Sequence, residues 1–340
     1  MATMQALVFE GIGTYGVRSM PRPEVQRGDD VLVKVRTVGI CGTDLHIVEV
    51  PPGFEAVPGT ILGHEFMGEV AAVGDQVRDL KPGDRVVIEP NIACTTCIYC
   101  KMGMPNECLT LTLTGIERHG GLAEYCVMPA RNVHKVPDSV SDEVAALTEP
   151  LSCVLGGTEK VRLQPGETAV ILGGGPIGLL YLQVFRAAGA RTLVVEPQPD
   201  RADYARSFGA HVVIDPKNED VAARVIQETG IGADVVVDAV GNQFGNALKL
   251  ARRRGAILLF GINLRAQENI RQFDITRNEY RVLGSWIGAF NFPMALNVLA
   301  SGVVDAQRMI THRISLGEFE QGIEELKTGR AIKVQVRPTS

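Results

Sequence analysis

The 340-residue sequence has no block of basic residues and no strong bias toward either charge. It contains 34 lysines and arginines against 39 aspartates and glutamates, which gives a formal charge of −5. Without a basic stripe, we expect no nucleic-acid partner. Internal repeats and low-complexity stretches are also missing, and a hydrophobic share of 45% allows sizeable cores. Disordered and collagen-like chains are therefore excluded.

Apolar runs that would cross a membrane are missing as well. The uncharged run from Thr168 to Phe185 has 18 residues, the bare length of a span, but it contains four glycines and a proline. A strand, a turn and a buried helix explain this run better. The opening residues, MATMQALVFEG, show neither a basic region nor a long apolar stretch of the secretory type. We therefore expect a cytoplasmic protein without a membrane contact.

A chain of this length favours two domains. Up to about residue 150, short β-rich runs separated by glycine and proline predict an all-β half with loops. These runs are Gln5–Glu10, Asp30–Val38, Gly68–Val73, Arg85–Glu89 and Leu122–Val127.

From Glu167 onward, apolar runs of strand length alternate with segments of helix length. The strand-like runs are Thr168–Leu172, Thr192–Val195, His211–Ile214, Ala233–Val240, Ala256–Phe260 and Arg281–Gly284. This alternation predicts a doubly wound parallel sheet, so the fold class is α/β. The C-terminal part predicts helices over 292–302 and 317–329, followed by a strand over 333–337.

The seven cysteines are unevenly distributed, and four of them lie within 15 residues: Cys94, Cys97, Cys100 and Cys108. In a chain without an export signal, this density indicates metal ligands rather than disulfides. Four thiolates can close a tetrahedral cage around zinc and leave no open position, which predicts a structural site. An iron–sulfur cluster is the alternative.

A glycine-rich turn follows the strand-like run TAVIL and opens a helix-like segment. Its residues are Gly173, Gly174, Gly175, Pro176, Ile177 and Gly178, which match G-x-G-x-x-G in the context that binds a dinucleotide. Glu196 lies 18 residues further on, where a carboxylate accepts from the ribose hydroxyls and repels a 2′-phosphate. The pattern predicts NAD, with NADP less favoured but kept open by the nearby Arg201.

Cys41, His64, Glu65 and Glu149 form a weaker group, because nothing in the local sequence brings them together. If they meet, a zinc with mixed cysteine, histidine and carboxylate ligands keeps a position for water or substrate and acts as a Lewis acid. Read alone, such residues are more often ordinary buried or surface groups.

Taken together and in order, these motifs resemble the zinc-dependent medium-chain alcohol and polyol dehydrogenases. The resemblance rests on the segments CGTDLH (41–46), GHE (63–65) and GDRV (83–86), the four cysteines, EPLS (149–152), the glycine turn and ITHR (310–313). It spans essentially the whole chain. It implies a GroES-like catalytic domain over 1–152 and 291–340, with a structural zinc lobe at about 90–110. A Rossmann domain over 153–290 would bind NAD, and the active site would lie between the two.

The resemblance also assigns roles to individual residues. Cys41, His64 and Glu65 resemble the ligands of a catalytic zinc, with Glu149 beside the metal, bound directly or through water. Thr43 and His46 resemble a proton relay that runs through a ribose hydroxyl, while zinc stabilises the alkoxide. The cofactor contacts would include Gly173, Gly175, Pro176, Ile177, Gly178, Glu196, Arg201, Phe260, Gly261, Ile262, Gly284, Ser285 and Trp286. Each chain would hold one catalytic and one structural zinc.

The implied activity is hydride transfer between NAD and a polyol, sugar or other secondary alcohol, with an alcohol or ketone as the small-molecule partner. EPLS resembles the polyol branch, although Ile47 replaces the tyrosine of animal sorbitol dehydrogenases. The CGTDLHI and THR segments equally resemble L-threonine dehydrogenases, but Asn91 and Glu149 depart from their pattern. The family also suggests a homo-oligomer, a tetramer rather than a dimer.

Two further alternatives belong to other classes. One is a non-catalytic, zinc-free nucleotide-binding relative, against which the intact ligand set argues. The other is an NADPH-dependent aldehyde reductase, against which Glu196 argues.

Overall fold

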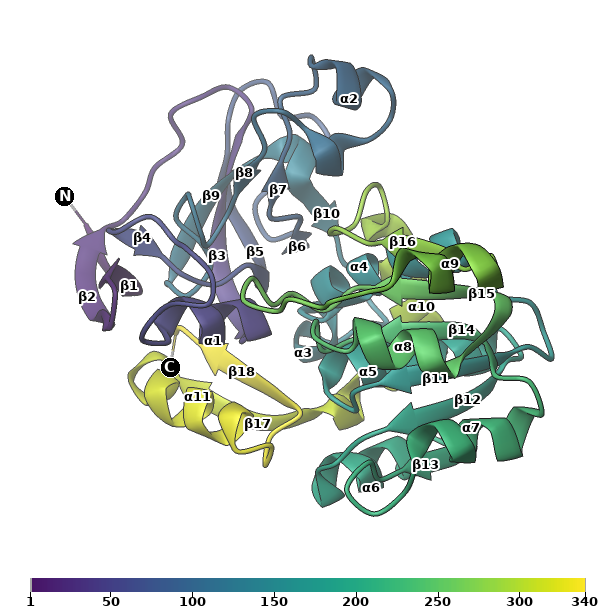
Figure 1. Cartoon of the computed structure of the whole chain (residues 1–340). Helices are drawn as coiled ribbons and strands as arrows, with labels where there is room; N and C mark the ends of the chain where they lie inside the picture. Colours follow the sequence, from purple (N-terminus) through teal and green to yellow (C-terminus); the bar gives the residue numbers. More distant parts are fainter. Residues whose placement is uncertain (1, 340) are drawn as a thin grey trace. The chain divides into compact units, whose positions relative to one another are not determined.

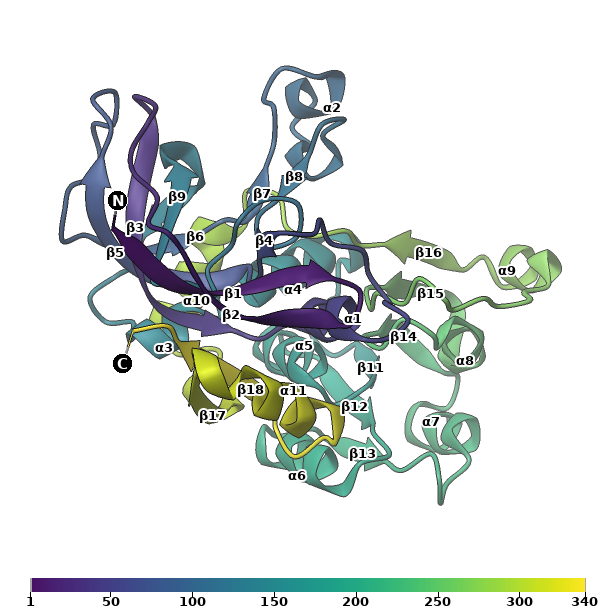
Figure 2. The ribbon, with the colours of Figure 1, turned by 90° about the vertical axis from the view of Figure 1, so that its left-hand side faces the viewer.

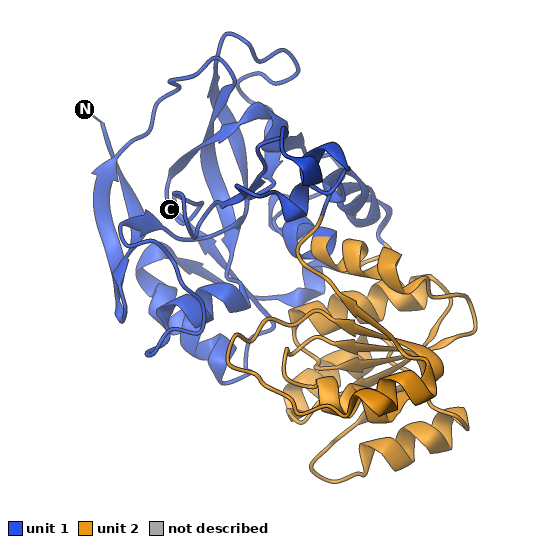
Figure 3. Ribbon diagram, turned by 45° about the horizontal axis from the view of Figure 1, so that its top comes forward, with its two compact units in different colours: residues 1–152, 289–302, 306–340 blue, residues 153–288, 303–305 orange. Residues whose placement is uncertain are grey.

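The computed structural model describes residues 2–339, which divide into two compact units (Figure 3). The first unit comprises the described residues through Ser152, Ala289–Gly302 and the residues from Ala306 on. The second comprises Cys153–Gly288 and Val303–Asp305.

The first unit is built mainly from antiparallel strands (Figure 1). In chain order its N-terminal part contains β1 (Thr3–Gly11), β2 (Thr14–Pro21), β3 (Asp30–Gly39), α1 (Gly42–Val48), β4 (Thr60–Ile61), β5 (Glu65–Val73), β6 (Arg85–Ile88), β7 (Asn91–Ile92), α2 (Ile98–Lys101), η1 (Pro105–Glu107), β8 (Thr112–Leu113), β9 (Tyr125–Pro129), η2 (Ala130–Asn132), β10 (Val133–Lys135), α3 (Asp142–Ala145) and the start of α4 (Thr148–Val161). Its C-terminal part contains α10 (Phe292–Ser301), η3 (Gln307–Met309), β17 (Ile310–Ser315), η4 (Leu316–Glu318), α11 (Phe319–Lys327) and β18 (Lys333–Arg337).

A seven-stranded sheet brings the two ends of the chain together in this unit. Its order is β10-β6-β5-β3-β18-β17, with β9 also paired to β3. The alternation of apolar residues in β3 buries Val31, Val33 and Val35 in the core, against which Phe319 of α11 also packs. Two pairings matter for the site, because Gly39 of β3 lies opposite Glu65 of β5 and opposite Gln335 of β18.

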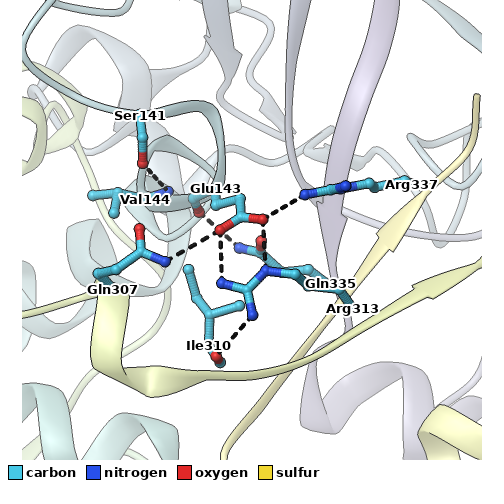
Figure 4. A network of polar contacts seen from close by, with 8 residues as sticks. All are labelled: Ser141, Glu143, Val144, Gln307, Ile310, Arg313, Gln335 and Arg337. Atoms are coloured by element: carbon cyan, nitrogen blue, oxygen red, sulfur yellow. Dashed lines mark hydrogen bonds and ion pairs between the residues drawn. The ribbon is translucent and has the colours of Figure 1, made fainter.

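Glu143 ties the C-terminal strands to α3 (Figure 4). Its carboxylate accepts hydrogen bonds from Arg313 of β17 at 2.6 and 2.8 Å and from Arg337 of β18 at 2.7 Å. Gln307 donates to the same carboxylate at 3.2 Å, and Gln335 donates to the Glu143 carbonyl at 2.7 Å. One acidic residue thus joins α3 to C-terminal segments that lie more than 160 residues further along the chain.

The second unit is a parallel sheet in the order β13-β12-β11-β14-β15-β16. After α4 its elements are β11 (Thr168–Leu172), α5 (Pro176–Ala187), β12 (Arg191–Val195), α6 (Pro199–Ser207), β13 (Val212–Ile214), α7 (Val221–Thr229), β14 (Ala233–Asp238), α8 (Phe244–Leu250), β15 (Ala251–Leu259), α9 (Gln272–Asn278) and β16 (Arg281–Gly284). Figure 2 shows α5 and α6 on one face of this sheet and α7 and α8 on the other. Helices on both faces explain why the buried stretches of its inner strands, such as Val235–Val237 and Ala256–Leu258, are apolar.

The prediction of an all-β first half is wrong, because α1 and α2 lie between strands and α3 and the start of α4 follow β10. Local capping explains two of them. Cys41 and Asp44 form a capping box at the start of α1, and the Ser141 hydroxyl accepts from the Val144 amide at the start of α3. Within residues 2–339, no helix combines the length and the apolar character needed to span a bilayer.

Candidate active site and metal centres

Cys41 lies at the junction between β3 and α1. It is the N-cap residue of α1, in an extended conformation, and its backbone amide donates to the Asp44 carboxylate at 2.9 Å. The predicted loop ligand is thus fixed at a helix start.

His64 and Glu65 approach Cys41 from the start of β5. Gly63 has a φ of +90°, and a Cβ there would lie 2.7 Å from a carbon of Leu122, so this turn requires glycine. One ligand atom each from Cys41, His64 and Glu65 lies within 4.8 Å of the other two. The structure therefore brings together three residues that sequence spacing alone did not connect.

Asp44 is a site residue that the sequence analysis did not single out. It is fully buried, and while one carboxylate oxygen caps α1, the other lies 3.8 Å from His64 Nδ1. An imidazole whose Nδ1 faces a carboxylate can offer Nε2 to a metal, and the carboxylate fixes the ring orientation. The sequence does contain one indication of its role, because Asp44 lies three residues after Cys41, a spacing that is typical of a capping box.

The electrostatics of this pocket favour a cation. Burial alone lowers the pKa of His64, but Cys41, Asp44 and Glu149 outweigh it and raise that pKa well above its ordinary value. Burial also raises the pKa of Asp44. A thiol, an imidazole and a carboxylate in an environment that attracts positive charge suit zinc, and three protein ligands leave a further position open.

Glu149 lies in the first turn of α4 and is 8% exposed. It is not among the three residues whose ligand atoms converge. Its charge nevertheless acts on both His64 and Lys333, so it is close enough to contribute to the site.

Thr43 and His46 lie one turn apart on α1, so their side chains lie on the same side of the helix. The Thr43 hydroxyl is 3.8 Å from the Cys41 sulfur. His46 is 36% exposed on its side chain, and its Nδ1 lies 3.3 Å from a Glu49 carboxylate oxygen. This arrangement places a hydroxyl beside one of the candidate metal ligands and an imidazole nearer to solvent.

Lys333 is a second site residue that the sequence analysis missed, although it predicted the strand that carries it. The side chain is 2% exposed, its Nζ forms an ion pair with Glu65, and it donates to the Ile40 carbonyl at 3.0 Å. Burial lowers the pKa of Lys333, but Glu65, Cys41 and Glu149 together raise it above its ordinary value.

The four clustered cysteines converge in the lobe formed by β7, α2, η1 and β8. One sulfur from each lies within 4.8 Å of the others, and two of the separations are 3.5 Å (Cys97 to Cys100) and 4.0 Å (Cys94 to Cys100). Zinc–sulfur bonds of about 2.3 Å in a tetrahedron give sulfur separations of about 3.8 Å. The spacing therefore fits a four-thiolate zinc site and is too long for disulfides.

Hydrogen bonds prepare part of this cage for a metal. Donors from Thr96 and Cys97 lower the pKa of Cys94 to about 5, whereas burial raises the pKa of Cys100 to about 12. The amides of Cys97 and Cys94 also donate to Cys94 and Cys108 sulfurs, at 3.3 and 3.2 Å. A metal would supply the charge that keeps all four sulfurs deprotonated.

In the second unit, the glycine turn joins β11 to α5. Gly173 has a φ of +102°, and a Cβ on Gly178 would lie 1.9 Å from the Gly173 carbonyl oxygen. Gly175 is the N-cap of α5, Pro176 is its first residue, and Ile177 follows in the first turn. These are the conformational reasons for glycine in a turn that presents a helix N-terminus to a pyrophosphate.

Glu196 directly follows β12 and is 4% exposed. Its carboxylate accepts from the amides of Gly174 and Gln198, both at 2.7 Å. The acid is thus held next to the glycine turn, as cofactor binding would require. Arg201 lies on α6, and Lys217 donates to the Pro197 carbonyl at 3.0 Å, so two basic residues also lie in this region.

The remaining predicted cofactor residues lie at the carboxyl edge of the same sheet. Phe260, Gly261 and Ile262 follow β15, and Gly284, Ser285 and Trp286 lie at the end of β16. Asp238, at the end of β14, was missed. It accepts from the amides of Val240, Gly241 and Gln243 at 2.7 to 2.9 Å and so shapes the neighbouring loop. Dinucleotides bind at this edge in doubly wound sheets.

Comparison with known proteins decides the family. Residues 27–138 match the alcohol dehydrogenase GroES-like domain, and residues 176–301 match the zinc-binding dehydrogenase domain. The chain is 34% identical to the probable D-xylulose reductase A of Aspergillus clavatus, covering 97% of this chain and 96% of that protein. It is 33% identical to the sorbitol dehydrogenase of Bacillus subtilis, with coverages of 98% and 97%. The chain belongs to the zinc-dependent medium-chain alcohol and polyol dehydrogenases.

A solved structure agrees with this assignment. The chain superposes on a zinc-binding dehydrogenase of Sinorhizobium meliloti bound to NADP, with a TM-score of 0.93, 36% identity and coverages of 99% and 100%. The expected fold class, a GroES-like domain with a Rossmann domain, is confirmed. The protein is an oxidoreductase that acts on CH–OH groups, and zinc and a nicotinamide nucleotide are its cofactors.

Proposed function

We propose that this dehydrogenase oxidises a polyol, a sugar or another secondary alcohol to the ketone, with NAD as the preferred hydride acceptor. The reaction converts the alcohol and NAD⁺ into the ketone, NADH and one proton. The observation that carries this proposal is the buried convergence of Cys41, His64 and Glu65. The names of the relatives, which act on xylulose and sorbitol, favour a polyol over threonine.

Each group of the first unit would have a distinct task. Cys41, His64 and Glu65 would hold a catalytic zinc, with Glu149 beside them. When bound, this zinc supplies a Lewis acid that makes the substrate hydroxyl more acidic. Thr43 would accept the hydroxyl proton as it donates its own proton onward toward His46, and His46 would release a proton to solvent, since an imidazole exchanges protons in the neutral pH range.

We also propose two zincs per chain. The second would lie in the cage of Cys94, Cys97, Cys100 and Cys108, where four sulfurs leave no position for a substrate. Its role would be to fold the lobe. The first unit would then be the catalytic domain and the second the NAD-binding domain. The homo-oligomeric state, tetramer or dimer, and the cytoplasmic location stay predictions from the sequence.

Preference for NAD rests on Glu196. A buried carboxylate whose oxygens are fixed by two amides cannot turn away from an adenosine ribose, so a 2′-phosphate would meet a negative charge. The positive charges of Arg201 and Lys217 would instead attract a 2′-phosphate and favour NADP. The NADP in the Sinorhizobium meliloti structure makes cofactor choice a necessary measurement for this chain.

The proposal is tested by metal analysis and a substrate panel. Purified protein should contain about two zincs per chain, and a chelator that removes one of them should abolish turnover while the fold remains. Oxidation of polyols, sugars, secondary alcohols and threonine is then followed by NADH formation. A fully active preparation without zinc contradicts the mechanism, and turnover of threonine alone contradicts the substrate class.

Cofactor choice has its own test, the variant Glu196→Gln. It retains an acceptor oxygen for the Gly174 or Gln198 amide but removes the charge, so the preference for NAD over NADP should fall about tenfold or more. Lys217→Met, a matched change of the opposite sign, should raise the preference. The measured quantity is the ratio of kcat/KM for the two cofactors. An unchanged ratio in Glu196→Gln would show that the adenosine binds elsewhere.

A further inference from the structure

Among the lysines and arginines that the structure describes, Lys333 alone is buried, with 2% of its surface exposed. A lysine without a partner would pay a large desolvation penalty there. Its Nζ instead has two partners, the Glu65 carboxylate and the Ile40 carbonyl. Ile40 directly precedes Cys41 in the chain. One ammonium therefore contacts one proposed ligand directly and holds the backbone next to another.

The backbone leaves room for this pair at Gly39. A Cβ on Gly39 would lie 2.4 Å from a Glu65 carboxylate oxygen and 2.8 Å from Lys333 Cε. Gly39 lies opposite Glu65 in one strand pairing and opposite Gln335 in the other. Lys333 lies two residues before Gln335 on β18, so the side chains of Glu65 and Lys333 both pass over Gly39. Any larger residue would push the carboxylate and the ammonium apart.

The contact is specific to one oxygen of Glu65. Lys333 engages Oε2, so Oε1 is the oxygen without the ammonium as a partner, and one carboxylate oxygen of Glu65 lies within 4.8 Å of the ligand atoms of Cys41 and His64. A carboxylate with both oxygens free can bind a metal through both and thereby fill a position that a substrate needs. Partners behind the ligands are known to orient them and to tune the metal.

We propose that Lys333 is a positioning residue that makes Glu65 a one-oxygen ligand and keeps the catalytic metal strongly Lewis-acidic. The inference rests on the proposed function, since it assumes zinc at Cys41, His64 and Glu65. Two effects follow from the same contact. The ammonium holds Oε2, which preserves an open position, and its positive charge withdraws electron density from the carboxylate.

The test compares Lys333→Met with the control Lys135→Met. Methionine retains most of the length of Lys333 but has neither charge nor donor. Lys135 is a 53% exposed lysine of β10 in the same unit, so its variant makes the same chemical change away from the site. Both are compared with wild type as zinc protein and after exchange of the open-site zinc for Co²⁺.

In Lys333→Met we expect zinc to leave the open site about tenfold more slowly in the presence of a chelator, because a repelling charge is gone and Glu65 can bind through both oxygens. The visible spectrum of the Co²⁺ protein should lose intensity, as a higher coordination number requires. Turnover should fall at least tenfold, with half-maximal turnover at higher pH, because the substrate hydroxyl is less acidic. Lys135→Met should match wild type in every measurement.

The outcomes separate the two proposals. If wild type holds no metal that depends on Cys41, the proposed function fails. If wild type holds the metal and Lys333→Met shows an unchanged Co²⁺ spectrum and release rate, the positioning role is overturned. Faster zinc loss in Lys333→Met also overturns it, because that result indicates a purely structural lysine. If Lys333→Met does not fold, the variant Lys333→Arg tests the positioning role instead. Its planar donor group must shift Glu65 and change the spectrum, and an unchanged spectrum contradicts the inference.

Discussion

His46 illustrates how a single residue can be tested apart from the metal site. It contacts Glu49, lies one turn from Thr43 and reaches solvent. His46→Gln should leave zinc and NAD binding nearly unchanged but slow alcohol oxidation by up to about 10², most strongly at low pH, where hydroxide cannot replace the missing base. Thr43→Val should slow alcohol oxidation more than His46→Gln does. Thr43→Ser, which retains the hydroxyl, should oxidise the alcohol at a rate close to that of wild type.

The measurement is the pH dependence of kcat for wild type and the three variants. Identical profiles for wild type and His46→Gln would remove His46 from the proton path. A low activity of Thr43→Ser equal to that of Thr43→Val would contradict the proposed role of Thr43, because serine retains the hydroxyl and should then still transfer the proton.

At the residue scale, the sequence indicates groups with a local signature. Glycine turns and cysteine spacing are local, so Gly173, Gly178 and the four-cysteine cage could be placed directly. Cys41 and His64 are 23 positions apart, and only the pairing of β3 with β5 brings them together. Lys333 lies still further away in the chain, and its role depends on a pairing with β3 that no spacing rule predicts.

At the scale of secondary-structure elements, the Glu143 carboxylate links α3 to β17 and β18. Hydrogen bonds from Arg313 lower the pKa of Glu143 to about 2 against the opposing effect of burial, and hydrogen bonds from Gln307 and Arg337 add to the lowering. Because the folded pKa lies below the unfolded value of about 4.5, the contribution to stability is complete above pH 4.5. It is lost as the pH falls toward 2.

Glu143→Gln should therefore lower the free energy of unfolding by about 1 to 2 kcal/mol at pH 7, a value reduced by the partial exposure of both arginines. The difference from wild type should shrink between pH 4.5 and 3. Urea unfolding at pH 7, 4.5 and 3.5 measures it. Glu10→Gln, which breaks an exposed pair with Arg18, is the control and should lower the free energy of unfolding much less than Glu143→Gln does. A pH-independent difference would contradict the ionic origin of the link.

Several strands were predictable because their patterns are short and regular. The predicted bounds of Thr168–Leu172, Arg281–Gly284 and Lys333–Arg337 agree with β11, β16 and β18. The short helices α1 and α3 were not predicted. Each begins at a cap and has only seven or four residues, and over so few residues helical periodicity is too brief to detect.

At the scale of the whole molecule, both candidate metal centres belong to the first unit and the glycine turn to the second. Ligands that bind only the native form raise the free energy of opening by RT ln(1 + [L]/Kd), about 2.7 kcal/mol at 100 times Kd. Zinc and NAD should therefore protect different parts of the chain from hydrogen exchange. NAD should protect residues 173–178 and 196–201, and zinc should protect residues 41–65 and 94–108.

Hydrogen exchange read by mass spectrometry resolves these segments in one experiment. Cys100→Ser removes one of four thiolates from the cage, so zinc should no longer protect residues 94–108 in this variant, whereas protection of residues 41–65 should persist. Gly173→Ala is the corresponding variant in the second unit, because Gly173 has a φ of +102° that alanine adopts only with strain. This variant should abolish protection by NAD and leave both effects of zinc intact. If NAD protected residues 94–108 as strongly as residues 173–178, the nucleotide would not act on the second unit alone. The proposal that the first unit binds zinc and the second binds NAD would then be wrong.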